Sequence, residues 1–360
     1  MFDSVRHHYQ IYPYPSYPLL ASVRLCDTYA LNLDALWSRF NGRLPPRHTR
    51  RILLAGCGTF SPYPWAVANP AATVTALDLS DRSLKRAHLH CLLHGRTHVE
   101  YRCGDLLDPV VLSGTYAAID SYGVLHHLQN PLEGLKALEK SLIPGGILRI
   151  MVYSRYARRS EESIRRAFRL IGVRTPQQAK SLMRRASPDS RLAEYAAGSD
   201  EMQSLSGIAD ALFHPCVHTY RIDELLAMIA LTSLQPLLFS HRDADENVNN
   251  ELNRLRDLEK ERRSPGNFIL YLRKDGMPES LAGEPVIMLN PCLRQAVSPL
   301  TLGTVRIAPR MGRETPSLGS RERKFLRRFV KPVPARVMGF DDVERVAVYK
   351  RALFLLEYRP

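Results

Sequence analysis

The stretch "ILLAGCGTFSPYPWAVANP", residues 52–70, begins as an apolar run and breaks at a Gly-x-Gly turn. A strand that leads through a glycine turn into a helix can hold a phosphate or a cofactor, because glycine lets the backbone approach the ligand and the helix N-terminus offers free N–H groups. Ser61 stands where a dinucleotide-binding loop has its third glycine, and Pro62 and Pro64 follow. The first helical turn tolerates both prolines, so we expect a strand, a turn and a short helix.

The next apolar run, "TVTALDLS" at residues 73–80, favours a ligand with a ribose but no diphosphate. Asp78 ends this run 22 residues after Gly56, where a carboxylate can accept hydrogen bonds from both ribose hydroxyls. Ser61 in place of the third glycine disfavours tight packing on a pyrophosphate. The chain also has no Gly-Lys-Ser/Thr run for the phosphates of a nucleoside triphosphate.

Strand and helix patterns alternate over most of the chain, which predicts βαβ units and an α/β fold with a doubly wound, mainly parallel sheet. The predicted strands cover residues 51–55, 73–80, 99–105, 116–128, 144–154, 235–240 and 267–274. The predicted helices cover residues 80–95 (with Ser80 as N-cap), 131–142, 220–234 and 246–263. Two more helices are expected near residues 318–330 and 340–354.

The same patterns divide the chain into three parts. Residues 1–49 are predicted to form an N-terminal arm and helical cap, and residues 50–274 the main domain. Within that domain, residues 156–213 show helical patterns and no convincing strand, which predicts a helical insertion. A linker over residues 275–285 leads into a small basic accessory domain (275–360), which we expect to be dispensable for cofactor binding but to contribute to partner binding.

Composition and the distribution of apolar residues and cysteines indicate the expected cellular compartment. No apolar stretch reaches the roughly 18–20 residues that cross a bilayer, which argues against a membrane partner. The N-terminus "MFDSVRHHYQ" lacks the apolar core of a signal peptide, which favours the cytoplasm. The six cysteines are scattered without a Cys-x-x-Cys pair, so neither a disulfide framework nor a metal site is predicted. Composition does not indicate an oligomeric state.

Two segments hold the excess of positive charge. Of the net +14, residues 155–194 carry +7 and residues 281–360 carry +8, which leaves −1 for the rest. Such concentration can mark a surface for nucleic acid or another polyanion. The segment "RRSEESIRRAFRLIG" fits a solvated amphipathic helix equally well, because its arginines surround apolar Ile164, Phe168 and Ile171. Both interpretations stay open.

Four motifs together resemble those of the class I S-adenosylmethionine-dependent methyltransferases. The runs "LLAGCGT", "VTALDLS" and "CGDLLD" are similar to the first three motifs of that family, and "GVLHHLQNPLEGLKALEKSLIPGGILRI" is similar to the segment after its fourth strand. The resemblance covers residues 50–155 and, more loosely, 215–274. The elements "YQIYPYPSY" and "ALFHPCVHTY" are similar to those of a bacterial subgroup. The resemblance implies a Rossmann-like methyltransferase fold, S-adenosyl-L-methionine as cofactor and methyl transfer as the reaction.

The resemblance also implies a cofactor site. The glycine turn would line the methionine part through its backbone, Asp78 would bind the ribose hydroxyls, and Asp105 would accept from the adenine amino group. The full set of matching positions is Gly56, Cys57, Gly58, Asp78, Leu79, Asp105, Leu106, Ser121 and Tyr122. Ala55 and Ala117 stand where the family often has acidic residues, which removes two supporting carboxylates.

Residues for the methyl acceptor are expected beside this site. His126 and His127 are the base candidates; alternatively, one caps the next helix and the other packs on the sheet. Prolines hold "HHYQIYPYPSYP" extended, either as a lid that offers Tyr14 to the reaction or as a packed arm. Pro215 makes a helical metal pair of the two neighbouring histidines implausible. The residues predicted to contact substrate are Tyr9, Tyr153, Arg155, Arg158, His214 and His218.

Two classes of function follow. The first is methyl transfer to an unidentified acceptor, for which the basic insertion suggests an anionic group. The run Asn/Asp-Pro-Pro-aromatic, usual in enzymes that methylate amide or nucleobase amino nitrogens, is replaced by "SYGVLHH", which weakens that choice. The second is a catalytically weak or inactive methyltransferase-fold scaffold that binds nucleic acid or protein through its basic segments. Cofactor binding distinguishes the two classes.

Overall fold

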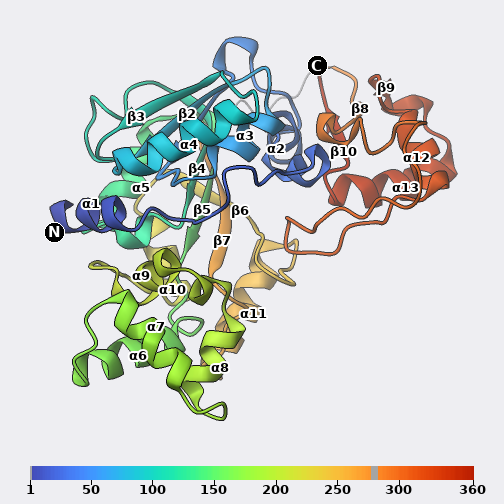
Figure 1. Cartoon of the computed structure of the whole chain (residues 1–360). Helices are drawn as coiled ribbons and strands as arrows, with labels where there is room; N and C mark the ends of the chain where they lie inside the picture. The colour runs from blue at the N-terminus through green and yellow to red at the C-terminus, as the bar shows by residue number, and fades with distance from the viewer. Residues whose placement is uncertain (1, 277–282) are drawn as a thin grey trace.

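The computed structural model describes residues 2–276 and 283–360, and its centre is a seven-stranded sheet (Figure 1). The strand order is β3-β2-β1-β4-β5-β7-β6. Strands β1 to β5 pair in parallel, and β7 runs antiparallel to both β5 and β6. This confirms the predicted α/β class. The strands are β1 (Arg51–Ala55), β2 (Thr73–Asp78), β3 (Val99–Cys103), β4 (Tyr116–Tyr122), β5 (Leu142–Val152), β6 (Leu234–Phe239) and β7 (Phe268–Lys274).

Helices cover both faces of this sheet, because alternate residues of each strand point to opposite sides. Ile52 and Leu54 belong to one apolar cluster, whereas Leu53 and Ala55 belong to a second. The flanking helices are α2 (Leu33–Asn41), α3 (Pro62–Ala68) and α4 (Asp81–Leu93) on the first face, and α5 (Pro131–Lys140), α10 (Ile222–Ile229) and α11 (Val248–Lys260) on the second. The predicted cap of α4 is confirmed, since the Ser80 side chain accepts from the Ser83 N–H.

The fourth strand is shorter than predicted. It ends at Tyr122 rather than at residue 128, because Gly123 takes a left-handed conformation (φ 82°) that turns the chain out of the sheet. Residues Leu125–His127 then form one turn of 3-10 helix. Both base candidates therefore lie on a turn beyond the sheet edge.

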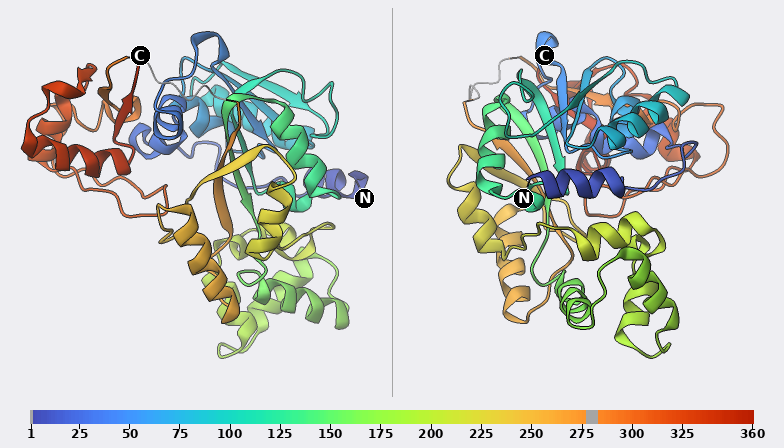
Figure 2. Two further views of the ribbon diagram at one scale, coloured as in Figure 1. Left: turned by 180° about the vertical axis from the view of Figure 1, so that it is seen from behind. Right: turned by 60° about the vertical axis from the view of Figure 1, so that its left-hand side comes forward.

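The helical insertion is built from α6 (Arg159–Leu170), α7 (Pro176–Arg185), α8 (Arg191–Gly198) and α9 (Leu205–Phe213). These helices share a small core of their own, which includes Phe168, Met183 and Ile208. They gather below the carboxyl ends of the parallel strands, as Figures 1 and 2 show in green. Residues 156–213, all of them described, contain no strand, as the sequence predicts.

The N-terminal arm is helical where it was expected to be extended. Helix α1 (Phe2–Ile11) includes the first residues of "HHYQIYPYPSYP", and regular structure stops just before Pro13. The reason is that the first prolines of the chain come after this helix, and a residue before proline is driven out of the helical region. The arm then continues through a 3-10 segment, Leu25–Leu31, into α2.

The C-terminal part shares its core with this arm. The predicted helices are present as α12 (Ser320–Arg327) and α13 (Phe340–Arg351), and a three-stranded sheet of β8 (Val286–Leu289), β9 (Val333–Pro334) and β10 (Leu355–Tyr358) joins them. Phe354 is fully buried against the ring of Tyr29, and the Asn290 amide donates to the Tyr29 carbonyl. The chain beyond Lys274 is therefore not an independent unit, which revises its expected dispensability. Of the predicted linker, residues 277–282 lie outside the described residues.

The structure also shows whether any described helix could span a membrane and which state the cysteines are in. Over the part of the chain that the structure describes, each helix is too short or too polar to span a membrane. All six cysteines are free, and five of them are buried. Most of these thiols serve as packing side chains.

Candidate functional site

A cavity of about 1170 Å³ opens where the carboxyl ends of the parallel strands meet. Its wall combines residues from the N-terminal arm, the sheet edge, the helical insertion and the C-terminal part. This edge is the usual ligand position in an open α/β sheet. The predicted site residues that line it are Tyr9, Tyr14, Gly56, Cys57, Gly58, Asp78, Leu79, Asp105, Leu106, Tyr122, His127, Tyr153 and Arg158.

The glycine turn presents bare backbone to this cavity. Gly56 (φ 73°) and Gly58 (φ 57°) are both left-handed, a conformation that strains any other residue. A Cβ atom on Gly56 would clash with the Val124 side chain, and one on Gly58 would lie 2.6 Å from the Tyr14 carbonyl oxygen. The amides of Gly56 and Cys57 both donate to the Leu77 carbonyl, which fixes the turn. The glycines thus let Val124 and the N-terminal arm pack directly on the main chain of the turn, which itself lines the cavity.

Asp78 is buried at the end of β2 and already accepts two hydrogen bonds. Its Oδ2 accepts from the Gly58 N–H at 2.7 Å, and its Oδ1 accepts from the Ser80 N–H at 2.8 Å. Burial raises the pKa of this carboxyl, and the backbone N–H groups oppose that effect. Each carboxylate oxygen keeps a second lone pair, so two hydroxyl donors of a ribose fit the side chain. The donor set and the glycine turn therefore fit a ribose-containing cofactor.

Ser121 does not join this wall, although the sequence placed it there. Its side chain is fully buried and its Oγ finds no partner among the described residues, whereas the neighbouring Tyr122 lines the cavity. The reason is strand alternation, since successive side chains of β4 point to opposite faces.

The two base candidates, His126 and His127, differ in whether they reach the cavity. His127 lines the cavity, and its Nδ1 lies 2.8 Å from the Cys216 carbonyl oxygen. His126 is fully buried outside the cavity wall, and its ring stacks on Tyr153 at 3.7 Å. Burial lowers the pKa of His127 to about 3, so its imidazole is neutral and only weakly basic at neutral pH. Of the pair, the structure brings only His127 to the site.

The two subgroup elements meet beside His127. Tyr9, from the N-terminal element, donates its hydroxyl to Asp210 at 2.8 Å. His214, from the second element, places its ring 5.4 Å from Tyr9 and 3.7 Å from His127. It lies behind the lining residues rather than in the wall. Asp210 lines the cavity and was not predicted; the available signal was a lone carboxylate inside the apolar run "GIADALF".

The remaining predicted contacts are arranged less favourably for a substrate. Arg155 lies outside the wall and is paired with Glu224 at 2.7 Å. Arg158 lines the cavity, but its guanidinium contacts Glu161 and Glu201 and lies 3.8 Å over the Tyr153 ring. His218 also stays outside, where its backbone N–H donates to the His126 carbonyl. The structure therefore neutralises the two arginines expected to hold an anion.

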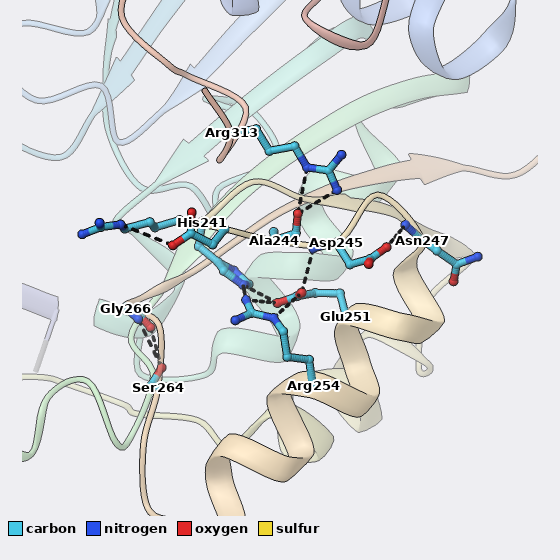
Figure 3. Close-up of polar contacts among 11 residues, drawn as sticks. His241, Ala244, Asp245, Asn247, Glu251, Arg254, Ser264, Gly266 and Arg313 are labelled. Atoms are coloured by element: carbon cyan, nitrogen blue, oxygen red, sulfur yellow. Dashed lines mark hydrogen bonds and ion pairs between the residues drawn. The ribbon is translucent and has the colours of Figure 1, made fainter. Parts of the chain in front are cut away.

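Sequence reasoning missed a second end of the cavity, formed by residues 240–243, 265–267, 309–310 and 312–314. A Cβ on Gly312 would clash with the His241 carbonyl. The irregular segment around Gly312, in the C-terminal part, therefore packs directly on the loop after β6. Arg313 donates twice to the Ala244 carbonyl at 2.9 Å (Figure 3). The C-terminal part is thus built into the site.

A buried ionic network holds the loop after β6 in place. In Figure 3 the Glu251 carboxylate lies between Arg254 and His241, and it also accepts from the Asp245 N–H. The contacts are 2.6 Å to His241 Nε2 and 2.8 Å to Arg254 Nη2. Burial alone would favour the protonated acid, but these hydrogen bonds lower the pKa of Glu251 from 4.5 to about 2.

We expect Glu251 to make the fold sensitive to acid. A depressed pKa stabilises the folded state above the unfolded value of 4.5, and this contribution is lost as the pH falls toward 2. The shift corresponds to on the order of 3 kcal/mol. Denaturant unfolding of Glu251→Gln at pH 7 and pH 3 should show a smaller difference than wild type. Glu261→Gln is the control, because Glu261 forms an exposed ion pair with Arg263, and its pH dependence should equal that of wild type. Equal pH dependence of unfolding in wild type and both variants would show that Glu251 does not cause the acid sensitivity.

Comparison with known proteins agrees with this geometry. Residues 53–150 match the sequence profile of a methyltransferase domain. An uncharacterized protein of Synechococcus is 32% identical over 247 residues, which are 65% of this chain and 59% of that protein. A ubiquinone biosynthesis O-methyltransferase of Paracidovorax citrulli is 33% identical over 106 residues, 29% of this chain and 43% of that protein. The chain thus matches less than two thirds of the length of either relative.

A solved structure extends the likeness to nearly the whole chain. PKMT2 from Rickettsia typhi superimposes with a TM-score of 0.58 at 14% identity, covering 97% of this chain and 78% of that one. Its complex with AdoHcy gives a TM-score of 0.53. At such identity the likeness shows the fold alone. The matched domain, this fold and the cofactor wall at the strand ends together show that the chain contains a methyltransferase domain with the fold of the class I, S-adenosylmethionine-dependent enzymes.

Proposed function

We propose that the protein transfers a methyl group from S-adenosylmethionine to an acceptor with an anionic group. The observation that carries the proposal is the continuity of one cavity from the glycine turn and Asp78 to a separate end where Arg310 lines the wall. The cofactor supplies a methyl group already activated on a sulfonium. The bare backbone of Gly56–Gly58 would hold its methionine part, Asp78 its ribose, and Asp105 with Leu106 its adenine.

The anionic acceptor is supported by the second end of the cavity. Arg242, Arg310 and Arg313 line it together with Asp243 and Glu314, and Arg242 and Arg313 already form ion pairs with Asp243 and Glu246. The guanidinium of Arg310 forms no ion pair or hydrogen bond with any residue that the structure describes, so it is available to a carboxylate or phosphate. Support for an anion therefore comes from the C-terminal part rather than from Arg155 and Arg158.

The acceptor atom would reach the cofactor near the first end. Tyr14 lines that region, and burial raises the pKa of its phenol, so it stays protonated and can donate a hydrogen bond. The helical insertion contributes Arg158, Glu201 and Asp210 to the same wall, a position suited to a lid over the acceptor. Radiolabel from S-adenosylmethionine, followed through fractionated cell extract, would identify what is methylated. Label that never leaves the cofactor would favour the scaffold alternative if the cofactor still binds.

Asp78→Ala is expected to weaken S-adenosylmethionine binding by about 2 kcal/mol, roughly thirty-fold, since two charge-assisted hydrogen bonds to the ribose are lost. The two backbone contacts that shape the glycine turn disappear as well. Calorimetric titration measures the change. Asp81→Ala, a half-exposed carboxylate three residues away, should bind like wild type. An unchanged dissociation constant in Asp78→Ala would remove Asp78 from the site.

Polyanion binding by the helical insertion is a separate proposal. Arg166, Arg184 and Arg185 are exposed, whereas Arg165 is half-buried and donates to the His214 carbonyl. If nucleic acid neutralises four phosphates, log affinity falls with log salt at a slope of about −3.6. Anisotropy with RNA and DNA should show this slope, and glutamine at the three exposed positions should flatten it. A variant that binds like wild type would leave these arginines as solubilising surface.

A further inference from the structure

The strongest unassigned feature is a buried cluster of three metal-ligand side chains at the cavity wall. His127, Asp210 and His214 place one ligand atom each within 4.8 Å of one another, and all three residues are buried. They come from the turn after β4, from α9 and from the residue that follows α9. His127 and Asp210 also line the cavity, so the cluster faces the space where an acceptor would bind.

One carbonyl sets the proton positions on both imidazoles. The Cys216 oxygen lies 2.8 Å from His127 Nδ1 and 2.6 Å from His214 Nδ1. Two hydrogen-bond acceptors do not approach so closely, so each Nδ1 carries the proton and donates it to this oxygen. The Cys216 N–H, 3.2 Å from His214 Nδ1, is the longer and weaker alternative. Both Nε2 atoms then hold lone pairs, which is the form of histidine that binds a metal, with its second nitrogen held by a carbonyl.

The cluster holds a buried imidazole nitrogen that no described donor satisfies. His214 is 1% exposed, and its Nε2 has no hydrogen-bond partner among the described residues. Asp210 accepts from the Tyr9 hydroxyl and interacts with the Tyr153 hydroxyl and with the charge of Arg158, but it forms no ion pair with a described residue. A buried carboxyl group beside two imidazole lone pairs forms a donor set that a bound cation would satisfy.

We propose that His127 Nε2, His214 Nε2 and an Asp210 oxygen bind a divalent transition metal ion such as Zn²⁺, with an open position toward the cavity. Two imidazoles and one carboxylate form a donor set suited to such ions rather than to Mg²⁺ or Ca²⁺. The sequence could not indicate this site, because His127 and His214 are 87 residues apart in the chain.

Metal binding requires a small rearrangement. Tetrahedral donors at about 2.0–2.1 Å from zinc lie about 3.3 Å from one another, which is closer than the 4.8 Å limit of the cluster. The ring centroids of His127 and His214 lie 3.7 Å apart with the planes tilted by 31°, so their Nε2 atoms must turn toward a common point. The hydrogen bonds to Cys216 sit at the opposite nitrogen and act as pivots for that rotation.

The test uses the full chain without cofactor or acceptor, so its outcome does not depend on methyl transfer. Protein stripped with a chelator is dialysed against Zn²⁺, freed of excess and analysed for metal. We expect one zinc ion per chain in wild type, and at least tenfold weaker binding in Asp210→Asn and His214→Gln. Co²⁺ in wild type should give the intense visible bands of a tetrahedral site, which decides the question even if a variant fails to fold.

A matched control is His94→Ala, which removes a histidine that stacks on His90 and does not belong to the cavity wall. It should bind zinc like wild type. Loss of zinc in His94→Ala, or equal binding by wild type and Asp210→Asn, would overturn the proposal. Wild type that takes up no zinc and gives only the weak bands of hydrated Co²⁺ would also overturn it, and would leave an ammonium group of the acceptor as the cation for Asp210.

Discussion

Replacing Arg149 by methionine is expected to lower the free energy of unfolding by about 3–5 kcal/mol, because it leaves a buried carboxylate without its partner. Arg149 donates Nε–H to Asp120 Oδ1 at 2.7 Å and Nη2–H to Oδ2 at 2.8 Å. Asp120 is 4% exposed, and after the substitution it would keep only the Trp65 indole N–H, 2.9 Å away. A single neutral donor does not compensate a buried charge.

Urea denaturation of purified protein measures this loss. Arg155→Met breaks an exposed pair with Glu224 and should cost no more than about 1 kcal/mol. The double variant Arg149→Met/Asp120→Leu should recover part of the stability, since it removes both charges together. Similar losses in Arg149→Met and Arg155→Met would show that the buried pair contributes no more than a surface pair.

Arg149 stabilises the fold and also lines the cavity of the candidate site. Its guanidinium lies 5.0 Å over the Tyr122 ring, and both residues line the cavity. The ion pair joins the ends of β4 and β5, from which the turn with His127 and the chain segment with Tyr153 both leave. The pair therefore acts as a positioning element for the reactive end of the cavity.

The sheet and the cofactor wall could be predicted because their signals are local. Each strand of the sheet is a short apolar run. Ser80 is the N-cap of the helix α4. Gly56 and Gly58 mark a left-handed turn that strains any other residue. The resemblance to a known family then placed Asp78 and Asp105 at the strand ends. In all these cases the decisive residues lie within about twenty positions of one another.

The acceptor side could not be predicted because its contacts join distant parts of the chain. Tyr9 and Asp210 are 201 residues apart, and no periodic pattern links them. His126 and His127 look equivalent in sequence, yet one stacks on Tyr153 and the other lines the cavity. The strands of the C-terminal sheet are two to four residues long, too short to give a period-two signal.

Removal of all residues after Lys274 is expected to leave a chain that cannot fold stably, because the C-terminal part completes the core around Tyr29. The Tyr29 ring is fully buried, with Phe354 at an edge-on centroid distance of 5.4 Å, and its hydroxyl accepts from the Arg310 N–H. The single substitution Phe354→Ala tests the same contact in the full chain. Loss of this fully buried ring should cost about 3–5 kcal/mol.

Thermal and urea unfolding of the truncated chain, of Phe354→Ala and of wild type measure these effects, with Val337→Ala as the control. Val337 lies in the same C-terminal part but is 65% exposed, so its truncation should change stability by less than about 0.5 kcal/mol. A chain ending at Lys274 that unfolds at the wild-type temperature and binds S-adenosylmethionine with wild-type affinity would show that the shared core is dispensable. The expected loss of both properties would mean that residues 283–360 stabilise the cofactor domain, in addition to supplying the arginines at the far end of its cavity.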